Sequence, residues 1–63
     1  MYPFDAAYEG VQYFGEYDFV DDDTIIVCFP DGTQSHEIPL RGFNPLLAAK
    51  TELRAYARRL QQR

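Results

Sequence analysis

The feature that most constrains this fold is a short run of apolar and β-branched residues at positions 24–29. Such residues favour extended backbone, and the Pro30-Asp31-Gly32 sequence that follows is typical of a tight turn. Both faces of the run are apolar, so a strand formed here must be covered on two sides. We therefore expect the rest of the chain to pair with this strand or to pack against it.

The chain is too short to build a large core. At 63 residues it is expected to form one domain that buries only about 60% of the surface its unfolded form exposes. Cys28 and His36 are the only cysteine and histidine, which excludes an internal disulfide and a tetrahedral Cys/His zinc site. The aspartates at 21–23 lack the spaced oxygens and the Glu of a calcium loop, so we interpret them as a solvated turn. We predict no metal and no cofactor.

Residues 11–20 alternate between apolar and mixed positions, which predicts a strand buried on one face. Gly15, in the middle of it, indicates a bulge or a close packing approach. A tight turn through the aspartates that follow would pair Phe19 with Ile26. In this register the predicted core face contains Val11, Tyr13, Tyr17, Phe19, Ile26, Cys28, Ile38 and Leu40.

A second turn and a helix complete the predicted fold. The Pro-Asp-Gly turn predicts a three-residue hairpin loop with a glycine bulge, so that residues 33–40 form a third strand at an edge. Asn44-Pro45 predicts the start of a helix over about 45–61, where apolar residues recur at helical spacing. The predicted fold is α+β: a three-stranded antiparallel β-meander (11–20, 24–29 and 33–40) followed by one C-terminal amphipathic helix packed on one face. Residues 1–10 are predicted to form an aromatic N-terminal arm beside this domain, 11–63.

Opposite charges are concentrated in opposite parts of the chain. Residues 1–40 contain nine acids and no Lys or Arg, whereas residues 41–63 contain six bases and a single acid, Glu52. The net charge of −4 therefore combines an acidic part and a basic part. Two interpretations remain open: the two parts neutralise each other within the fold, or one of them meets a charged partner.

The sheet face that points away from the single helix is the predicted partner-binding surface. In the predicted register it carries apolar side chains with an acidic rim, which is typical of an interface. The alternative is that the aromatic arm covers this face. The candidate residues are Phe14, Glu16, Asp18, Val20, Ile25, Val27, Phe29 and Glu37.

A second candidate surface is a basic helix flank formed by Lys50, Arg54 and Arg58. Their four-residue spacing places them side by side, where they could contact nucleic-acid phosphates or an acidic protein. Nucleic-acid-binding domains usually have a basic balance, and the net charge of −4 argues against that function.

The sequence contains no catalytic motif. Cys28 and His36 are predicted to lie diagonally on one face, but no third group that would orient them is visible, so we expect no enzyme. No apolar run is long enough to cross a bilayer, and the N-terminal residues do not form a secretory signal. We therefore expect a cytoplasmic protein with no membrane partner.

These observations together predict a small, acidic, non-enzymatic protein-binding module, acting as an adaptor or stoichiometric inhibitor of a larger cytosolic complex. One concrete version is a phage- or plasmid-type inhibitor of a host nucleic-acid-handling machine, such as an anti-CRISPR. The first alternative is a structural protein that forms a homodimer through the second sheet face. The second is a nucleic-acid-binding module that uses the basic helix flank.

Overall fold

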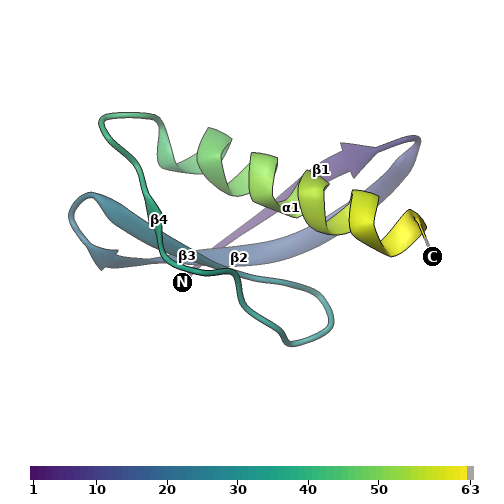
Figure 1. Ribbon diagram of the computed structural model, residues 1–63, viewed down its shortest axis with the longest axis horizontal. Helices are drawn as coiled ribbons and strands as arrows, with labels where there is room; N and C mark the ends of the chain where they lie inside the picture. The colour runs from purple at the N-terminus through teal and green to yellow at the C-terminus, as the bar shows by residue number, and fades with distance from the viewer. Residues whose placement is uncertain (63) are drawn as a thin grey trace.

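The computed structural model describes residues 1–62 as one antiparallel sheet with a C-terminal helix, an α+β fold (Figure 1). The strands lie in the order β1-β2-β3-β4, so the predicted meander is present and gains a fourth strand at its N-terminal side. Arg63, one of the six bases, lies outside the described residues. The elements are β1 (Tyr2–Tyr8), β2 (Val11–Asp21), β3 (Thr24–Cys28), β4 (Ile38–Pro39) and α1 (Pro45–Gln61).

The N-terminal segment is a strand of the sheet and not the separate arm predicted for residues 1–10. β1 pairs with β2 along its whole length. Glu9 and Gly10 form the two-residue turn between them, and both have positive φ angles, 49° and 79°, as a type I′ hairpin turn requires. Phe4 and Ala6 are buried while their neighbours are more exposed, so β1 contributes one face to the core.

A β-bulge in β2 reverses the predicted orientation of the central strand. Phe19 pairs with Ile25 and not with Ile26, because Val20 is an extra residue on β2 that has no partner on β3. A slip of one residue moves every side chain of a strand to the opposite face. The predicted core positions of Ile26 and Cys28 are therefore wrong, and these two side chains lie half-buried on the face away from α1.

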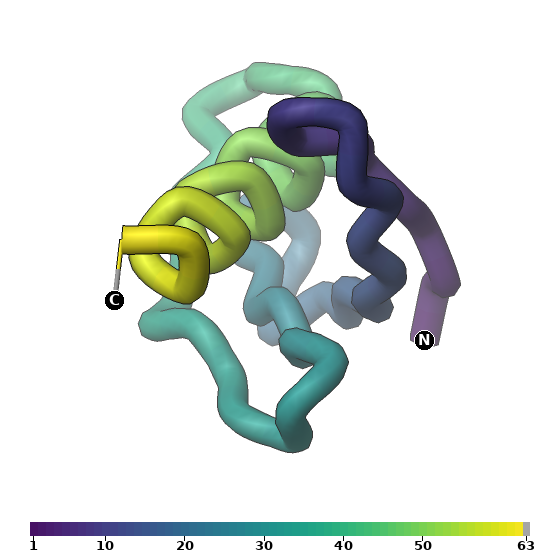
Figure 2. Tube along the Cα trace, turned by 90° about the vertical axis from the view of Figure 1, so that its right-hand side faces the viewer, coloured from purple at the N-terminus to yellow at the C-terminus, as the bar shows by residue number. Residues whose placement is uncertain are grey.

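The core lies between α1 and one face of β3. The bulge in β2 orients this face of β3 toward the helix. Ile25 and Val27 are fully buried there, and Phe29, just beyond β3, is nearly so. The helix contributes a stripe of small and apolar residues, Ala49, Leu53 and Ala57, of which none is exposed. Figure 2 shows that α1 lies against one side of the curved sheet. The rest of the buried cluster is Phe4, Ala6 and Leu40, with Tyr13, Tyr17, Ile38, Ala48 and Tyr56 packed around it.

The turn after the central strand forms as predicted. The Phe29 N–H donates to the Thr33 carbonyl (2.8 Å) and the Gly32 N–H donates to the Phe29 carbonyl (3.0 Å). Gly32 has a φ of 89°, the left-handed conformation that a glycine bulge needs. The Ser35 N–H then donates to the Val27 carbonyl (2.8 Å), which continues the contact between the two arms of the hairpin beyond the turn.

The third predicted strand is regular only at its end. Beyond Ser35 the register changes by one residue, so that Ile38 pairs with Ile25 and Pro39 pairs with Thr24. The Ser35 hydroxyl accepts the Val27 N–H (2.9 Å), which satisfies a backbone donor where the ladder is interrupted. β4 is consequently reduced to two residues and ends at Pro39, which lacks the N–H of a ladder donor.

The helix begins at the predicted residue because Asn44 caps it. The Asn44 Oδ1 accepts the backbone N–H groups of Leu46 (2.9 Å) and Leu47 (3.2 Å). Pro45 occupies the first helical position, where its missing N–H carries no cost. Two arginines in the last turn complement the helix dipole.

The orientation of the central strand makes a direct prediction for Val27. The substitution Val27→Asp places a carboxylate at a position with no exposed surface, and we expect the cooperatively folded state to be lost, since total stability is only about 5–15 kcal/mol. Far-UV circular dichroism during thermal unfolding measures this. Val20→Asp is the matched control, because Val20 is 48% exposed, and it should remain folded. A folded Val27→Asp variant would contradict the packing of β3 under α1.

Gly15 provides a second test of the packing. A Cβ atom added there would lie 3.0 Å from the Cys28 carbonyl oxygen and 3.5 Å from the Phe4 ring. We expect Gly15→Val to lower the free energy of unfolding by about 1–3 kcal/mol in urea denaturation, as overpacking does. Gln12→Val, at an exposed position of the same strand, should change it by only about 0.5 kcal/mol. Equal effects of the two variants would show that β2 and β3 are not held this closely.

Candidate functional site

The strongest candidate site is the sheet face away from α1, which we call the open face. No helix or strand of residues 1–62 lies over it. Side chains alternate between the two faces of a strand, so the pairing of β1, β2 and β3 determines which residues this face carries. They are Pro3, Asp5, Ala7, Gln12, Phe14, Glu16, Asp18, Ile26 and Cys28.

Phe14 is the apolar centre of the open face. Its side chain is 65% exposed, although it sits in the middle of the longest strand. Beside it is a shallow depression of about 380 Å³ that Pro3, Cys28 and Pro30 help to line. A large aromatic ring next to an apolar hollow is the kind of surface that binding partners cover.

The open face is strongly acidic. Asp5, Glu16 and Asp18 are its charged residues, and it carries no base. The Gln12 side-chain amide donates to the Asp5 carboxylate, and the Phe19 N–H donates to the Asp18 carboxylate (3.0 Å). No salt bridge joins these carboxylates to a base within residues 1–62. The acidic and basic parts of the chain therefore do not neutralise each other by direct pairing in the described structure.

Six of the eight predicted partner-binding residues separate into two groups. Phe14, Glu16 and Asp18 lie together on the open face. Ile25 and Val27 lie beneath α1 and Phe29 is almost completely buried, so the prediction that these three line the outer face is wrong. The cause is the bulge at Val20, which turns β3 over.

The remaining predicted residues lie at the margins. Val20 is exposed at the bulge, and Glu37 is exposed just before β4. Pro3 and Asp5 also lie on the open face but are not among the predicted partner-binding residues, because residues 1–10 are predicted to form an arm and not a strand. Two features of the N-terminal sequence indicate this strand. Phe4 and Ala6 alternate with polar or exposed positions, and Glu9-Gly10 follows them as a two-residue turn.

The basic helix flank lies beside β1 and away from the open face. The Arg54 Nε–H donates to the Ala7 carbonyl (3.4 Å), which ties the helix to the N-terminal strand. Lys50 is half-buried and Arg58 is exposed. The three residues are one turn apart along α1, as predicted, and Arg54 has a structural contact in addition to its charge.

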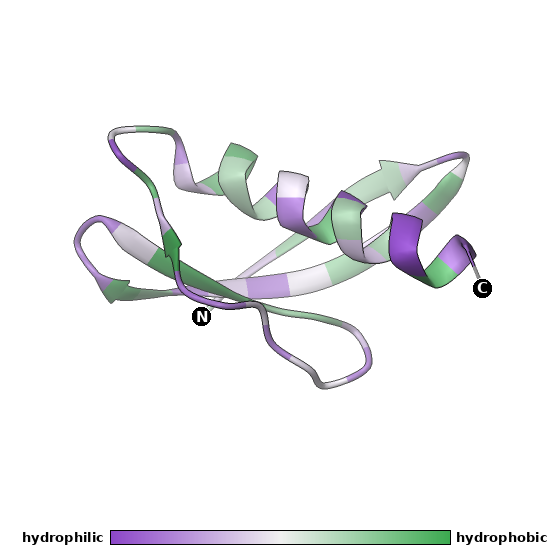
Figure 3. Cartoon of the chain, viewed as in Figure 1, coloured by the Kyte–Doolittle hydropathy of each residue, from purple (hydrophilic) through white to green (hydrophobic). Residues whose placement is uncertain are grey.

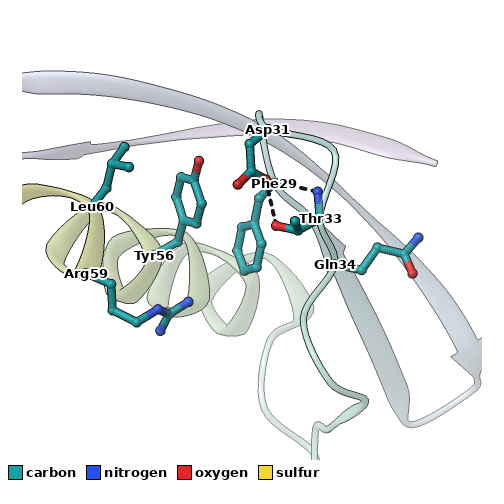
Figure 4. Close-up of a pocket in the computed structure, with 7 residues that line it drawn as sticks. All are labelled: Phe29, Asp31, Thr33, Gln34, Tyr56, Arg59 and Leu60. Atoms are coloured by element: carbon teal, nitrogen blue, oxygen red, sulfur yellow. Dashed lines mark hydrogen bonds between the residues drawn. The ribbon is translucent and has the colours of Figure 1, made fainter.

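A smaller polar pocket of about 250 Å³ lies where the Pro-Asp-Gly turn meets the end of α1 (Figure 4). Phe29 and Tyr56 stack face to face in it, with ring centroids 4.6 Å apart and planes within 9°. Asp31 accepts hydrogen bonds from the Thr33 hydroxyl (2.6 Å) and the Thr33 N–H (2.9 Å). Both hydrogen bonds lower the pKa of Asp31 below its ordinary value, and the bond from the Thr33 hydroxyl has the larger effect. The contacts close the turn against the helix.

The structure shows no grouping for metal or nucleophilic chemistry in its described part. Within residues 1–62 no three His, Cys, Asp or Glu side chains come together as metal ligands. The Cys28 Sγ accepts a weak hydrogen bond from the Gln34 amide (3.6 Å). His36 lies in the irregular segment before β4 and is not part of the ladder between β3 and β4. None of the described helices has the length and apolar character needed to span a bilayer.

No protein-family model matches the chain, and comparisons with curated proteins and with solved structures give no significant match.

The hydrogen bonds of Asp31 give a prediction for pH dependence. A carboxyl group whose pKa is lowered on folding stabilises the fold above its unfolded pKa of about 4, and this contribution is lost as the pH falls through the folded pKa. Thr33→Val should raise the pKa of Asp31, measured by NMR titration, and should destabilise the protein at neutral pH more than at acid pH. Thr51→Val is the control, because the Thr51 hydroxyl donates to the Leu47 carbonyl (3.0 Å) and not to a carboxylate. An unchanged Asp31 pKa in Thr33→Val would contradict this assignment.

Proposed function

We propose that this chain is a small non-enzymatic binding module that docks its open face onto a basic protein surface. The observation that carries the proposal is the exposed Phe14 ring amid three carboxylates on an uncovered sheet face. An exposed aromatic residue can supply the central anchor of an interface, and the surrounding charges select the partner and speed the encounter. The partner surface should therefore present Lys or Arg around an apolar hollow.

A contact of ordinary size would use a substantial part of the surface of this molecule. A typical specific interface buries about 800 Å² on each partner, which is about a fifth of the 4278 Å² surface of this molecule. Strand addition at a sheet edge is a poorer mode, because both edge strands contain a proline, Pro3 in β1 and Pro39 in β4.

The charge of the open face also favours a different partner over a second copy. A twofold homodimer through this face would place Asp5, Glu16 and Asp18 opposite the same three carboxylates, which costs free energy. A basic surface that normally holds nucleic acid is complementary instead. Covering such a surface would make the chain a stoichiometric inhibitor, and bridging it to another protein would make the chain an adaptor.

Affinity capture from a cell lysate, with partners identified by mass spectrometry, tests this proposal. Phe14→Ser should weaken binding of the captured partner by about 2 kcal/mol or more, roughly thirtyfold. The double variant Glu16→Lys/Asp18→Lys should abolish capture, and added salt should weaken the wild-type complex. Val11→Ser is the control for Phe14, because Val11 is exposed on the same strand but on its other face.

The charge control is Glu9→Lys/Asp22→Lys, which makes the same change in net charge at two exposed turns. This control variant should still capture the same partner as the wild type. If Phe14→Ser and Glu16→Lys/Asp18→Lys retain the same partners as the wild type, the open face is not the binding site. Failure of the wild type to recover any specific partner would count against the proposal as a whole.

The basic helix flank defines the alternative that the same proteins can test. Single-stranded DNA at low salt is the probe, measured by fluorescence anisotropy. Binding that is lost in Lys50→Glu/Arg54→Glu/Arg58→Glu and kept in Phe14→Ser would identify a nucleic-acid-binding module instead. Under the present proposal we expect no such binding, because the acidic residues of the sheet repel phosphate.

A further inference from the structure

β3 is too short to pair with the whole length of β2, and this leaves a notch in the sheet. β2 has 11 residues, but its pairing with β3 begins only at Glu16, opposite Cys28. Pro30 follows soon after and starts the turn, so the chain leaves the sheet there. Figure 3 shows β2 continuing beside β1 while the chain after β3 turns away. The notch is the side of residues 11–15 that faces away from β1.

The backbone groups of Gln12 and Phe14 face this notch. Tyr8 and Val11 flank the two-residue turn between β1 and β2, so they form a hydrogen-bonded pair, and such pairs alternate along the ladder. The odd-numbered residues of β2 therefore bond to β1, and the even-numbered residues direct their N–H and C=O groups to the other side. Within residues 1–62 no strand lies opposite Gln12 and Phe14 on that side, and no backbone group of a turn or loop bonds to them.

The depression of about 380 Å³ on the open face lies at this notch. It is lined from β1 by Pro3, from β2 by Phe14, Gly15 and Glu16, and from the end of β3 and the turn by Cys28, Phe29 and Pro30. Free space is therefore present where the pairing of β2 and β3 stops. Gln12 and Phe14 each offer one backbone donor and one backbone acceptor beside it, which are the groups that an added strand requires.

The outer edges of the sheet are blocked, whereas the notch is not. The outward-facing backbone of β1 includes Pro3, which has no N–H, and Ala7, whose carbonyl accepts the Arg54 Nε–H (3.4 Å). β4 has two residues, and one of them is Pro39. Folded proteins protect free strand edges with proline or lysine, and residues 11–15 contain neither. Among residues 1–62 the notch is therefore the best position for a further strand.

We propose that an extended basic segment of a partner protein adds to β2 at this notch, in line with β3 and antiparallel to β2. Its backbone pairs with Gln12 and Phe14, and alternate side chains lie on the open face. Lys or Arg suits these positions, because Glu16 lines the depression and the exposed Phe14 ring can contact the stem and the charge of a basic side chain. The inference rests on the proposed function for the basic character of the partner and adds how the partner is held.

The other side chains of the added strand face the helix side of the sheet. There they meet Val11, which is exposed, and Tyr13, whose hydroxyl accepts the Gln61 amide (3.0 Å). Apolar residues suit these positions, so the expected segment alternates basic and apolar residues. A second copy does not supply such a segment, because residues 1–40 contain no Lys or Arg and the described bases that follow lie in α1 or in the turn before it.

NMR titration of the nitrogen-15-labelled protein tests the inference. The probe is a capped peptide of about seven residues in which lysine and valine alternate, added at low salt up to about 1 mM. At saturation it should slow hydrogen exchange of the Gln12 and Phe14 amides at least about tenfold, because each gains a hydrogen-bond acceptor. The amides of Val11 and Tyr13 already bond to β1, so their exchange should change little. The same peptide with glutamate in place of lysine should not bind.

Gln12→Pro tests the backbone contact directly. Proline removes an N–H that faces the notch and that β1 does not use, so the fold should persist, as circular dichroism can confirm, while the peptide binds at least about tenfold more weakly. Gln12→Val is the matched control, because it loses the same side-chain bond to Asp5 but keeps the N–H, and it should bind as the wild type does. Methylation of the backbone nitrogens of the peptide lysines removes the donors to β2 without altering the protein, and it should abolish binding.

Several results would overturn the inference. One is binding of the lysine peptide with unchanged exchange at Gln12 and Phe14, and another is equal binding by Gln12→Pro or by the methylated peptide. Equal binding of the glutamate peptide, or no binding of the lysine peptide at about 1 mM, would also overturn it. Slowed exchange of both amides at high protein concentration without peptide would place a second copy in the notch instead.

Failure of this inference can be distinguished from failure of the proposed function. A lysate partner that is lost with Phe14→Ser but retained by Gln12→Pro would support the proposed function and overturn strand addition. Absence of any lysate partner, together with slowed exchange of the Gln12 and Phe14 amides by the lysine peptide, would count against the proposed function and support the notch as a strand-binding site.

Discussion

Burial of Ile25 and Val27 beneath α1 is the interaction on which this fold depends. Both side chains are fully covered, as is Leu53 of the helix that covers them. Each such side chain contributes about 1.5–3 kcal/mol, a large share of the stability available to a chain of this size. The neighbouring strands place Phe4 and Tyr17 around this contact, and the Asn44 cap fixes where the helix starts. Removal of the contact would leave a sheet with no core.

The same contact determines which surface is free for binding. One helix covers one face of a four-stranded sheet, so the other face remains open in the described structure. That face holds an aromatic ring, and its charged residues are acids, whereas four of the bases, Lys50, Arg54, Arg58 and Arg59, are carried by the helix. A groove of about 300 Å³ between β4 and the start of α1, beside Phe43, is different again, since it is mainly apolar and Glu52 is its only charged lining residue. The two surfaces therefore differ in chemistry, one being aromatic and acidic and the other mainly apolar.

Local signals in the sequence were sufficient to predict much of the fold. Asn44-Pro45 fixes the start of the helix, and Pro30-Asp31-Gly32 fixes the turn after β3, because each depends on the conformational preferences of a few adjacent residues. The bulge at Val20 has no comparable signal. β3 is apolar on both faces, so hydrophobicity does not distinguish the two registers, and the helix packing decides between them. The bulge at this one residue decided where the predicted partner-binding residues lie: Phe14, Glu16 and Asp18 precede it and lie on the open face, whereas Ile25 and Val27 follow it and are buried.

The short length of β4 has a consequence for aggregation. The stretch at 24–29 combines β-branched and aromatic residues with no charge, the composition of segments that stack into cross-β fibrils. β2 protects one edge of β3 over nearly its full length, but the other edge is held by a two-residue strand, one isolated bridge from Cys28 to Gln34 and the hydrogen bonds of Ser35. Local unfolding of the segment between the turn and β4 would expose the backbone N–H and C=O groups on this edge of β3, while the rest of the sheet stays folded. Resistance to fibril formation in this protein should therefore depend on that segment more than on the global stability of the fold.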